Sequence, residues 1–269
     1  MILKNPEIKK ILNNIKKNFF LSKINLNNNF FKKFSDERVI EVPYLLSRYN
    51  NQNKILEVGL SLADLGLVQA LLYLKKIAKV KLYAFDLVNI KNTLSRFKGI
   101  DIKKNFEFHQ VDIRKFKTKE KFDFISLIST LEHVGFDEIN TSRNIKGSFL
   151  RKKKISKVKN NNNDFIAIKN LAKILNDKGS LIITLPFGNR QTIVSRDAYG
   201  LFAYFREYNL RRVLKLIQLS NLSLRDMQFY EFDKKWKKIY NYKKFNNSSY
   251  SIFEPVKSIV CLELKKIKK

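Results

Sequence analysis

The amino-acid sequence predicts an α/β fold in which a mostly parallel sheet is covered on both faces by helices. Short apolar runs alternate with longer amphipathic runs through most of the chain, a pattern typical of strands joined by crossover helices. The run Phe122–Ser129 is almost entirely apolar, as expected for a strand buried on both faces. The run Lys54–Val58 meets Gly59 just before a helical pattern begins, and this order predicts a ligand site at the strand's carboxyl end.

Residues 1–50 are expected to form a helical cap that precedes the sheet. Met1–Phe34 contains apolar residues at helical spacing, with lysines between them. Such a basic amphipathic helix either covers the domain with its apolar face or lies on a membrane or a partner. Ser35–Tyr49 predicts a second helix, with Ser35 as its N-cap and Pro43 limiting its regularity. The apolar positions of the first helix are Ile8, Ile11, Leu12, Ile15 and Phe19.

Residues 51–188 contain the alternating core. The first crossover helix is expected over Ala63–Ala78, where Ser61 and Asp64 have the spacing of a capping box. A later helix is expected over Asp164–Leu175, with Asp164 as N-cap and Gly179 as a stop signal. The strands expected in the whole chain are Lys54–Val58, Val80–Phe85, Phe106–Val111, Phe122–Ser129, Ser180–Leu185, Ser223–Phe232 and Val256–Leu264.

Two segments stand apart from this alternation. Residues 135–163 lack periodicity and include the basic run Arg151–Lys154, so they predict either a lid or substrate loop over the ligand side or a floppy insert. Residues 189–269 are expected to form a substrate-side part. It begins with a long amphipathic stretch, Tyr199–Leu219, and includes a basic segment around Trp236. No linker divides the chain, so residues 1–269 are interpreted as a single domain.

Composition limits the function without naming it. The net charge of +30, from 54 basic and 24 acidic residues, favours a polyanionic partner such as nucleic acid, an anionic membrane or a phosphate-bearing substrate. Abundant Lys, Asn, Ile and Phe also suit a purely compositional origin of this charge. Cys261 is the only cysteine, which excludes an intrachain disulfide and a cysteine-rich zinc site. With no signal-peptide pattern and no membrane-spanning run, a cytoplasmic location is expected.

Three acidic residues lie at or near the ends of successive predicted strands: Glu57, Asp86 and Asp112. A carboxylate at the end of the second strand can accept hydrogen bonds from both hydroxyls of a ribose. An Asp at the end of the third strand can accept one from the exocyclic amine of adenine. Each acid alone also suits a cap or a turn, but three on consecutive strands favour an adenosine ligand.

The ordered motifs of the core resemble those of class I S-adenosylmethionine-dependent methyltransferases, in particular the branch associated with small molecules and surface glycans. The resemblance covers residues 39–188 and is most specific at Leu131–Gly135 and Leu185–Gly188. It implies a Rossmann-like, doubly wound, mostly parallel sheet of seven strands with an antiparallel last strand, plus N-terminal helices. The other motifs are Ile55–Gly59, Tyr83–Asp86 and Val111–Arg114.

The resemblance also implies S-adenosylmethionine as cofactor and a role for each matching residue. Glu57, Gly59 and Ser61 would border its methionine part, and Asp86 with Leu87 would hold the ribose. Adenine would lie against Asp112 and Ile113, and Ser129 would border the site after the fourth strand. One departure is that the family's three alternating glycines correspond here to Gly59, Ser61 and Ala63. These residues are still small enough for a close approach.

The sequence therefore predicts a methyltransferase acting on a small molecule or glycan precursor, by O-methylation in cell-surface polysaccharide synthesis. His133, next to Glu132, is the candidate catalytic base, because histidine titrates near neutrality. His133 could instead only fix the loop, and His109 is expected to be structural. No metal site is expected. The alternatives are an RNA methyltransferase or RNA-binding protein, for which Tyr199–Arg212 would supply a stacking surface, and a non-catalytic methyltransferase-like scaffold.

Overall fold

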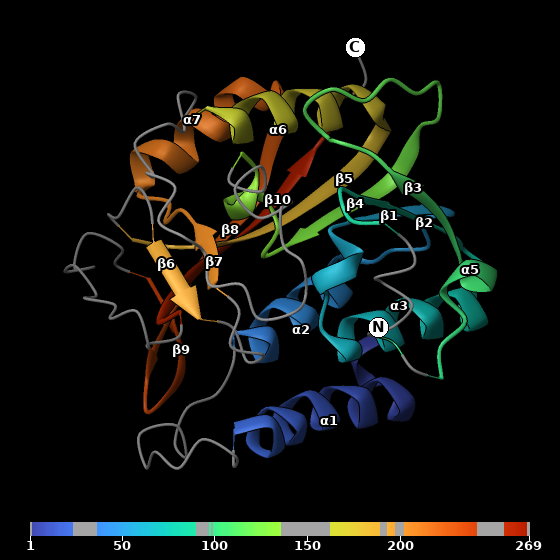
Figure 1. Cartoon of the computed structure of the whole chain (residues 1–269), viewed down its shortest axis with the longest axis vertical. Coiled ribbons are helices and arrows are strands. Elements are labelled where there is room, and N and C mark those ends of the chain that lie inside the picture. Colours follow the sequence, from blue (N-terminus) through green and yellow to red (C-terminus); the bar gives the residue numbers. More distant parts are fainter. Residues whose placement is uncertain are drawn as a thin grey trace.

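The computed structural model describes residues 2–23, 37–89, 97, 99–135, 162–188, 193–196, 202–240 and 256–267. In that part of the chain, eight strands form one central sheet in the order β3-β2-β1-β4-β5-β10-β8-β9 (Figure 1). The strands are β1 Lys54–Val58, β2 Lys81–Asp86, β3 Phe106–Gln110, β4 Phe122–Ile128, β5 Leu175–Pro186, β8 Ser223–Asp233, β9 Lys235–Ile239 and β10 Ser258–Lys265.

The first five strands of the sheet, β3 to β5, are parallel, and the final strand β10 is antiparallel to both of its neighbours. This confirms the predicted mostly parallel sheet with an antiparallel last strand. The sheet has one strand more than the seven expected. The segment around Trp236 forms the edge strand β9, in which three exposed lysines accompany the half-buried Trp236 and Ile239. Lysines on an edge strand oppose further pairing, which explains why this strand resembles a plain basic segment in the sequence.

Helices cover both faces of the sheet in separate apolar cores. One face carries α2 (Arg38–Arg48) and α3 (Leu65–Ala78), and the other carries α6 (Asn163–Ile174) and α7 (Leu210–Ser220) (Figure 1). Alternating residues of the central strand β4 enter the two cores: Ile125 and Leu127 face α6 and α7, whereas Phe124 and Ile128 face α2 and α3. The double coverage explains why β4 is nearly all apolar.

The N-terminal helix α1 (Pro6–Lys23) lies outside α2 and α3, so that these helices separate it from the sheet (Figure 1). Ile8 and Ile15 of α1 are buried in the same apolar core as α2 and α3. Gly66 of α3 lies directly under this contact, because a Cβ atom at Gly66 would collide with the Ile15 side chain.

Several predicted helix boundaries differ from those in the structure. Helix α3 begins at Leu65, and its N-cap is Asp64, whose side chain accepts from Gly66 N, whereas Ser61 lies in the preceding turn. Helix α6 ends at Ile174, and Gly179 lies within β5. Its N-cap is Asn162, whereas Asp164 is fully buried in the first turn. Pro43 is accommodated inside α2.

The stretch Tyr199–Leu219 is divided between β7 (Phe202–Phe205), which pairs with β6 (Ile193–Arg196), and α7. The remaining short elements are η1 (Ile2–Lys4), η3 (Leu60–Leu62), α5 (Ile102–Asn105) and η4 (Leu131–His133). The proposed lid with its basic run Arg151–Lys154, and the predicted cap residue Ser35, lie outside the described residues.

Candidate functional site

The carboxyl ends of β1, β2 and β4 meet at the turn that follows β1. Gly59 begins this turn with a φ of 91°, a left-handed conformation that favours glycine. A Cβ atom at Gly59 would collide with the Thr130 side chain, which follows β4. The glycine is therefore required by the close approach of two turns of this protein.

Asp86, at the end of β2, links the turn that follows β1 to the turn that follows β2. Its Oδ2 accepts from Ser61 N at 2.7 Å, and its Oδ1 accepts from Val88 N at 2.8 Å. Burial raises the pKa of Asp86, while these backbone donors act in the opposite direction. The Ser61 side chain and the Leu87 N–H also hydrogen-bond to this carboxylate and lower its pKa. Since a carboxylate offers about four acceptor positions, hydroxyl groups of a ligand would share them with these donors of the protein. Ser61 is buried in this contact, and Leu87 is half-buried beside it.

Glu57, the fourth residue of β1, is 1% exposed, and its Oε2 accepts a hydrogen bond from the Ser126 hydroxyl of β4. Burial raises the pKa of Glu57 to about 8, an effect that Ser126 and the charge of Arg38 reduce and that of Asp86 increases. The charge of Asp86 on β2 therefore acts on Glu57 of the neighbouring strand β1.

Asp112 and Ile113 follow β3 and are less available than expected. The Asp112 carboxylate pairs with Arg114 in two-pronged fashion, with Nη2 to Oδ2 at 2.7 Å and Nε to Oδ1 at 2.9 Å. Burial alone would raise the pKa of Asp112, but the hydrogen bonds from Arg114 and its positive charge keep this pKa below its ordinary value. Ile113 packs into the core beneath α6. An adenine ring here would share Asp112 with Arg114.

Two residues of α2 reach the same end of the sheet, and the sequence reading missed both. Glu41 is fully buried, accepts from the Ser129 hydroxyl at 2.7 Å, and pairs with Arg38. Ser129 itself has a left-handed backbone with a φ of 45°. An acid four residues before the apolar Leu45 lies on the buried face of a helix, and this signal could have revealed Glu41.

Glu132 and His133 lie in η4, directly after β4. The Glu132 side chain is 3% exposed, and its Oε1 is 3.9 Å from Nε2 of His133, whose side chain is 30% exposed. The other Glu132 oxygen, Oε2, is buried and has no hydrogen-bond partner. Burial and the nearby Glu41 raise the pKa of Glu132 to about 8, against the charges of Arg38 and Arg206. An unsatisfied buried oxygen is costly and suits a ligand that donates a hydrogen bond.

Of the aromatic and arginine residues that suggested an RNA-stacking surface, four have described side chains, and three of these are buried or half-buried. Arg206 and Tyr208 are 1% and 0% exposed, and Arg212 pairs with the buried Asp164 at 2.8 Å. Arg211 alone among the described side chains of this set is exposed. Arg206, Tyr208 and Arg212 therefore do not offer faces on which bases could stack.

His109, on the edge strand β3, is exposed, and its Nε2 lies 3.1 Å from Glu107 Oε1. Among the described residues, no group of three or more His, Cys, Asp or Glu side chains is arranged to hold a metal ion. Nor does any helix in the described ranges combine the length and apolar character needed to cross a bilayer.

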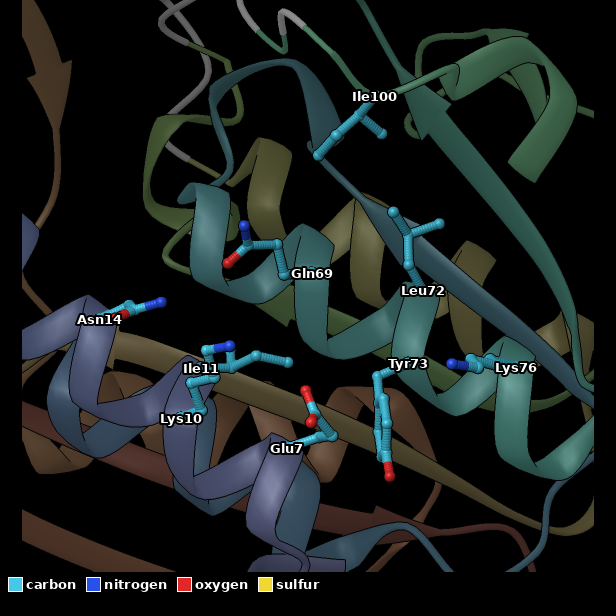
Figure 2. A pocket seen from close by; sticks show the side chains of 9 residues that line it. All are labelled: Glu7, Lys10, Ile11, Asn14, Gln69, Leu72, Tyr73, Lys76 and Ile100. Atoms are coloured by element: carbon cyan, nitrogen blue, oxygen red, sulfur yellow. The ribbon is translucent and has the colours of Figure 1, made fainter.

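A separate groove of about 400 Å³ lies between α1 and α3 (Figure 2). Figure 2 shows Glu7, Lys10 and Ile11 of α1 opposite Tyr73 and Lys76 of α3. The groove runs along the later turns of α3, whereas the candidate site lies before the first turn of that helix. The groove contains none of the predicted site residues.

The fold is that of S-adenosylmethionine-dependent methyltransferases. A SAM-dependent methyltransferase from Methanosarcina mazei superposes with a TM-score of 0.52 at 12% identity, covering 84% of this chain and 98% of that one. A second such enzyme, from Clostridium acetobutylicum, gives a TM-score of 0.50 at 13% identity, covering 94% and 98%. No family model and no curated protein matches the sequence.

Proposed function

We propose that this protein is an S-adenosylmethionine-dependent methyltransferase whose acceptor is a small molecule or a glycan precursor. The observation that carries the proposal is Asp86, held at the end of β2 by two backbone N–H groups next to the Gly59 turn. In a doubly wound fold, this strand end is where a ribose is bound. The shared fold of the two solved methyltransferases supports the same interpretation. A cytoplasmic enzyme that O-methylates precursors of cell-surface polysaccharides is the specific form we propose.

The residues at the strand ends fit such a cofactor in the chemistry of their side chains. The Asp86 carboxylate would accept from the ribose hydroxyls, sharing its acceptor positions with its donors from Ser61 and Leu87. Glu57 and the turn at Gly59 and Ser61 would lie along the methionine part, where a buried acid favours a cationic group. Asp112 and Ile113 would border adenine, and Ser129 would close the site after β4.

When bound, S-adenosylmethionine supplies a methyl group on a positively charged sulfur, ready for in-line displacement. The chain's own residues then align the acceptor and remove its proton. His133 would take the proton of the acceptor hydroxyl, and Glu132 beside it would stabilise the resulting imidazolium. Because the pKa of Glu132 is about 8, this support becomes complete only as the pH rises past that value.

Cofactor binding is the first test, measured by isothermal titration with S-adenosylhomocysteine. Asp86→Asn keeps the shape of the side chain but removes its charge and one acceptor, so affinity should fall about 10- to 100-fold. The matched control is Asp177→Asn, on an exposed residue at the start of β5, which should bind like the wild type. Wild-type protein that binds no cofactor, or Asp86→Asn that binds equally well, would reject the proposal.

The acceptor is the second test, made by supplying radiolabelled methyl donor with panels of sugar nucleotides and of RNA. Labelled sugar products sensitive to His133→Gln would support the proposed reaction. Labelled RNA would replace it with the alternative that the net charge of +30 suggests. Cofactor binding without transfer to any acceptor in either panel would favour the non-catalytic scaffold.

A further inference from the structure

The turn η4, which carries Glu132 and His133, is held by side chains from a distant part of the chain. Arg206, just after β7, is 1% exposed, and its guanidinium donates to two carbonyls of this turn. Nη2 donates to Val134 O at 2.8 Å and Nη1 donates to Leu131 O at 3.3 Å. The backbone N–H of Arg206 donates to Glu132 O at 3.2 Å. Arg206 therefore contacts η4 on both sides of Glu132 and His133, the candidate catalytic pair.

A second donor reinforces this contact. The Tyr208 hydroxyl donates to Leu131 O at 3.3 Å, and Val134 N donates to the same oxygen at 3.2 Å. Tyr208 is fully buried, and its own backbone bonds to Pro186 O and Gly188 N fix it to the end of β5. Three donors thus converge on the carbonyl oxygen of Leu131, although a carbonyl oxygen has only two lone pairs.

The charge of Arg206 has a nearby partner. Asp164 in the first turn of α6 is fully buried, 3.9 Å from Arg206 Nη1, and it binds Arg212 at 2.8 Å. A lysine could supply the charge of Arg206, but its compact ammonium cannot span two carbonyls with a rigid planar fork. The arrangement therefore uses the shape of arginine as well as its charge.

We propose that Arg206 is a positioning residue for the reaction, holding Glu132 and His133 in register with the strand ends. The inference rests on the proposed function for its catalytic meaning, whereas the clamp itself concerns η4 alone. Without the clamp, the turn could relax, and Glu132 would no longer be held beside the imidazole. Displacing a catalytic pair by about 1 Å can lower a rate about 100-fold.

Histidine NMR tests the clamp without cofactor or acceptor, because the chain contains only two histidines. His109, exposed on β3, reports on global changes, and His133 reports on η4. Arg206→Lys and Arg206→Met are expected to displace the His133 imidazole resonance and alter its pH titration while leaving His109 as in the wild type. Tyr208→Phe should displace it less. The control Arg211→Met removes an exposed arginine nearby and should change neither signal.

Folded Arg206→Lys with an unchanged His133 titration would overturn the proposal. If Arg206→Met does not fold, the lysine and phenylalanine variants still decide it. In the cofactor titration, Arg206→Lys should bind S-adenosylhomocysteine like the wild type, and with the acceptor from the screen its kcat should fall about 100-fold. Failure of the wild type to bind cofactor would reject the proposed function, whereas the NMR result would stand separately.

Discussion

Glu57→Gln is expected to change how stability depends on pH. In the folded protein, burial raises the pKa of Glu57 from its ordinary value of 4.5 to about 8. The folded state therefore keeps a proton that the unfolded chain releases near pH 4.5. The stability from this proton is complete below that pH and is lost as the pH rises towards 8. Glutamine resembles the protonated acid and can still accept the bond from Ser126, so the variant lacks this loss.

The size of the effect follows from the pKa difference. Each pH unit between the two values is worth about 1.4 kcal/mol, so from about pH 5.5 to 7.5 the variant should gain at most about 3 kcal/mol over the wild type. Urea unfolding of both proteins at the two pH values measures it, with exposed Asp177→Asn as the control. Parallel pH profiles for Glu57→Gln and wild type would show that Glu57 is not buried as described.

Two further predictions concern glycines. Gly59→Ala should destabilise the protein more than Gly99→Ala. Both glycines have left-handed φ values, so each substitution costs about 1 kcal/mol in backbone strain. A Cβ atom at Gly59 would in addition collide with Thr130, whereas a Cβ atom at Gly99 would meet no atom within 4 Å. Equal unfolding free energies would contradict the close packing of the two turns. Gly66→Ala should cost about 1–3 kcal/mol by displacing α1, and Ile15→Ala should relieve part of that cost in the double variant. Strictly additive effects would argue against this contact.

The strands in the parallel half of the sheet could be predicted from the sequence, because the spacing and type of their apolar residues are local features of the chain. The strand Lys54–Val58 was predicted to the residue, and the other core strands to within one or two residues at most ends. The exception is β5, which begins at Leu175, where the prediction continued a helix to the same residue. The first turns of α3 and α6 were misjudged, because the choice between neighbouring polar caps depends on tertiary contacts. Asp164 has a typical capping residue type, yet it is buried against Arg212.

The positions of the predicted site residues along the strands could be read from the sequence. Asp86 occupies the expected position at the strand end, and Glu57 lies near it. What sequence could not supply was the pairing of charges between segments distant in the chain. The ion pair of Asp112 with Arg114 is local, but the role of Glu41 depends on α2 folding over the end of β4. The aromatic-arginine stretch resembled a surface because residue type alone does not distinguish an exposed arginine from one buried against carbonyl groups.

The position of α2 affects where this protein can be shortened. Glu41 accepts a hydrogen bond from the Ser129 hydroxyl, and at the other end of the helix Arg48 forms an ion pair with Asp226 of β8. A recombinant fragment beginning at residue 51 would contain every described strand of the central sheet, but it would lack one wall of the candidate site. Such a trimmed chain is a poor choice for crystallisation or for activity screens, since its inactivity would say nothing about the protein that retains α2.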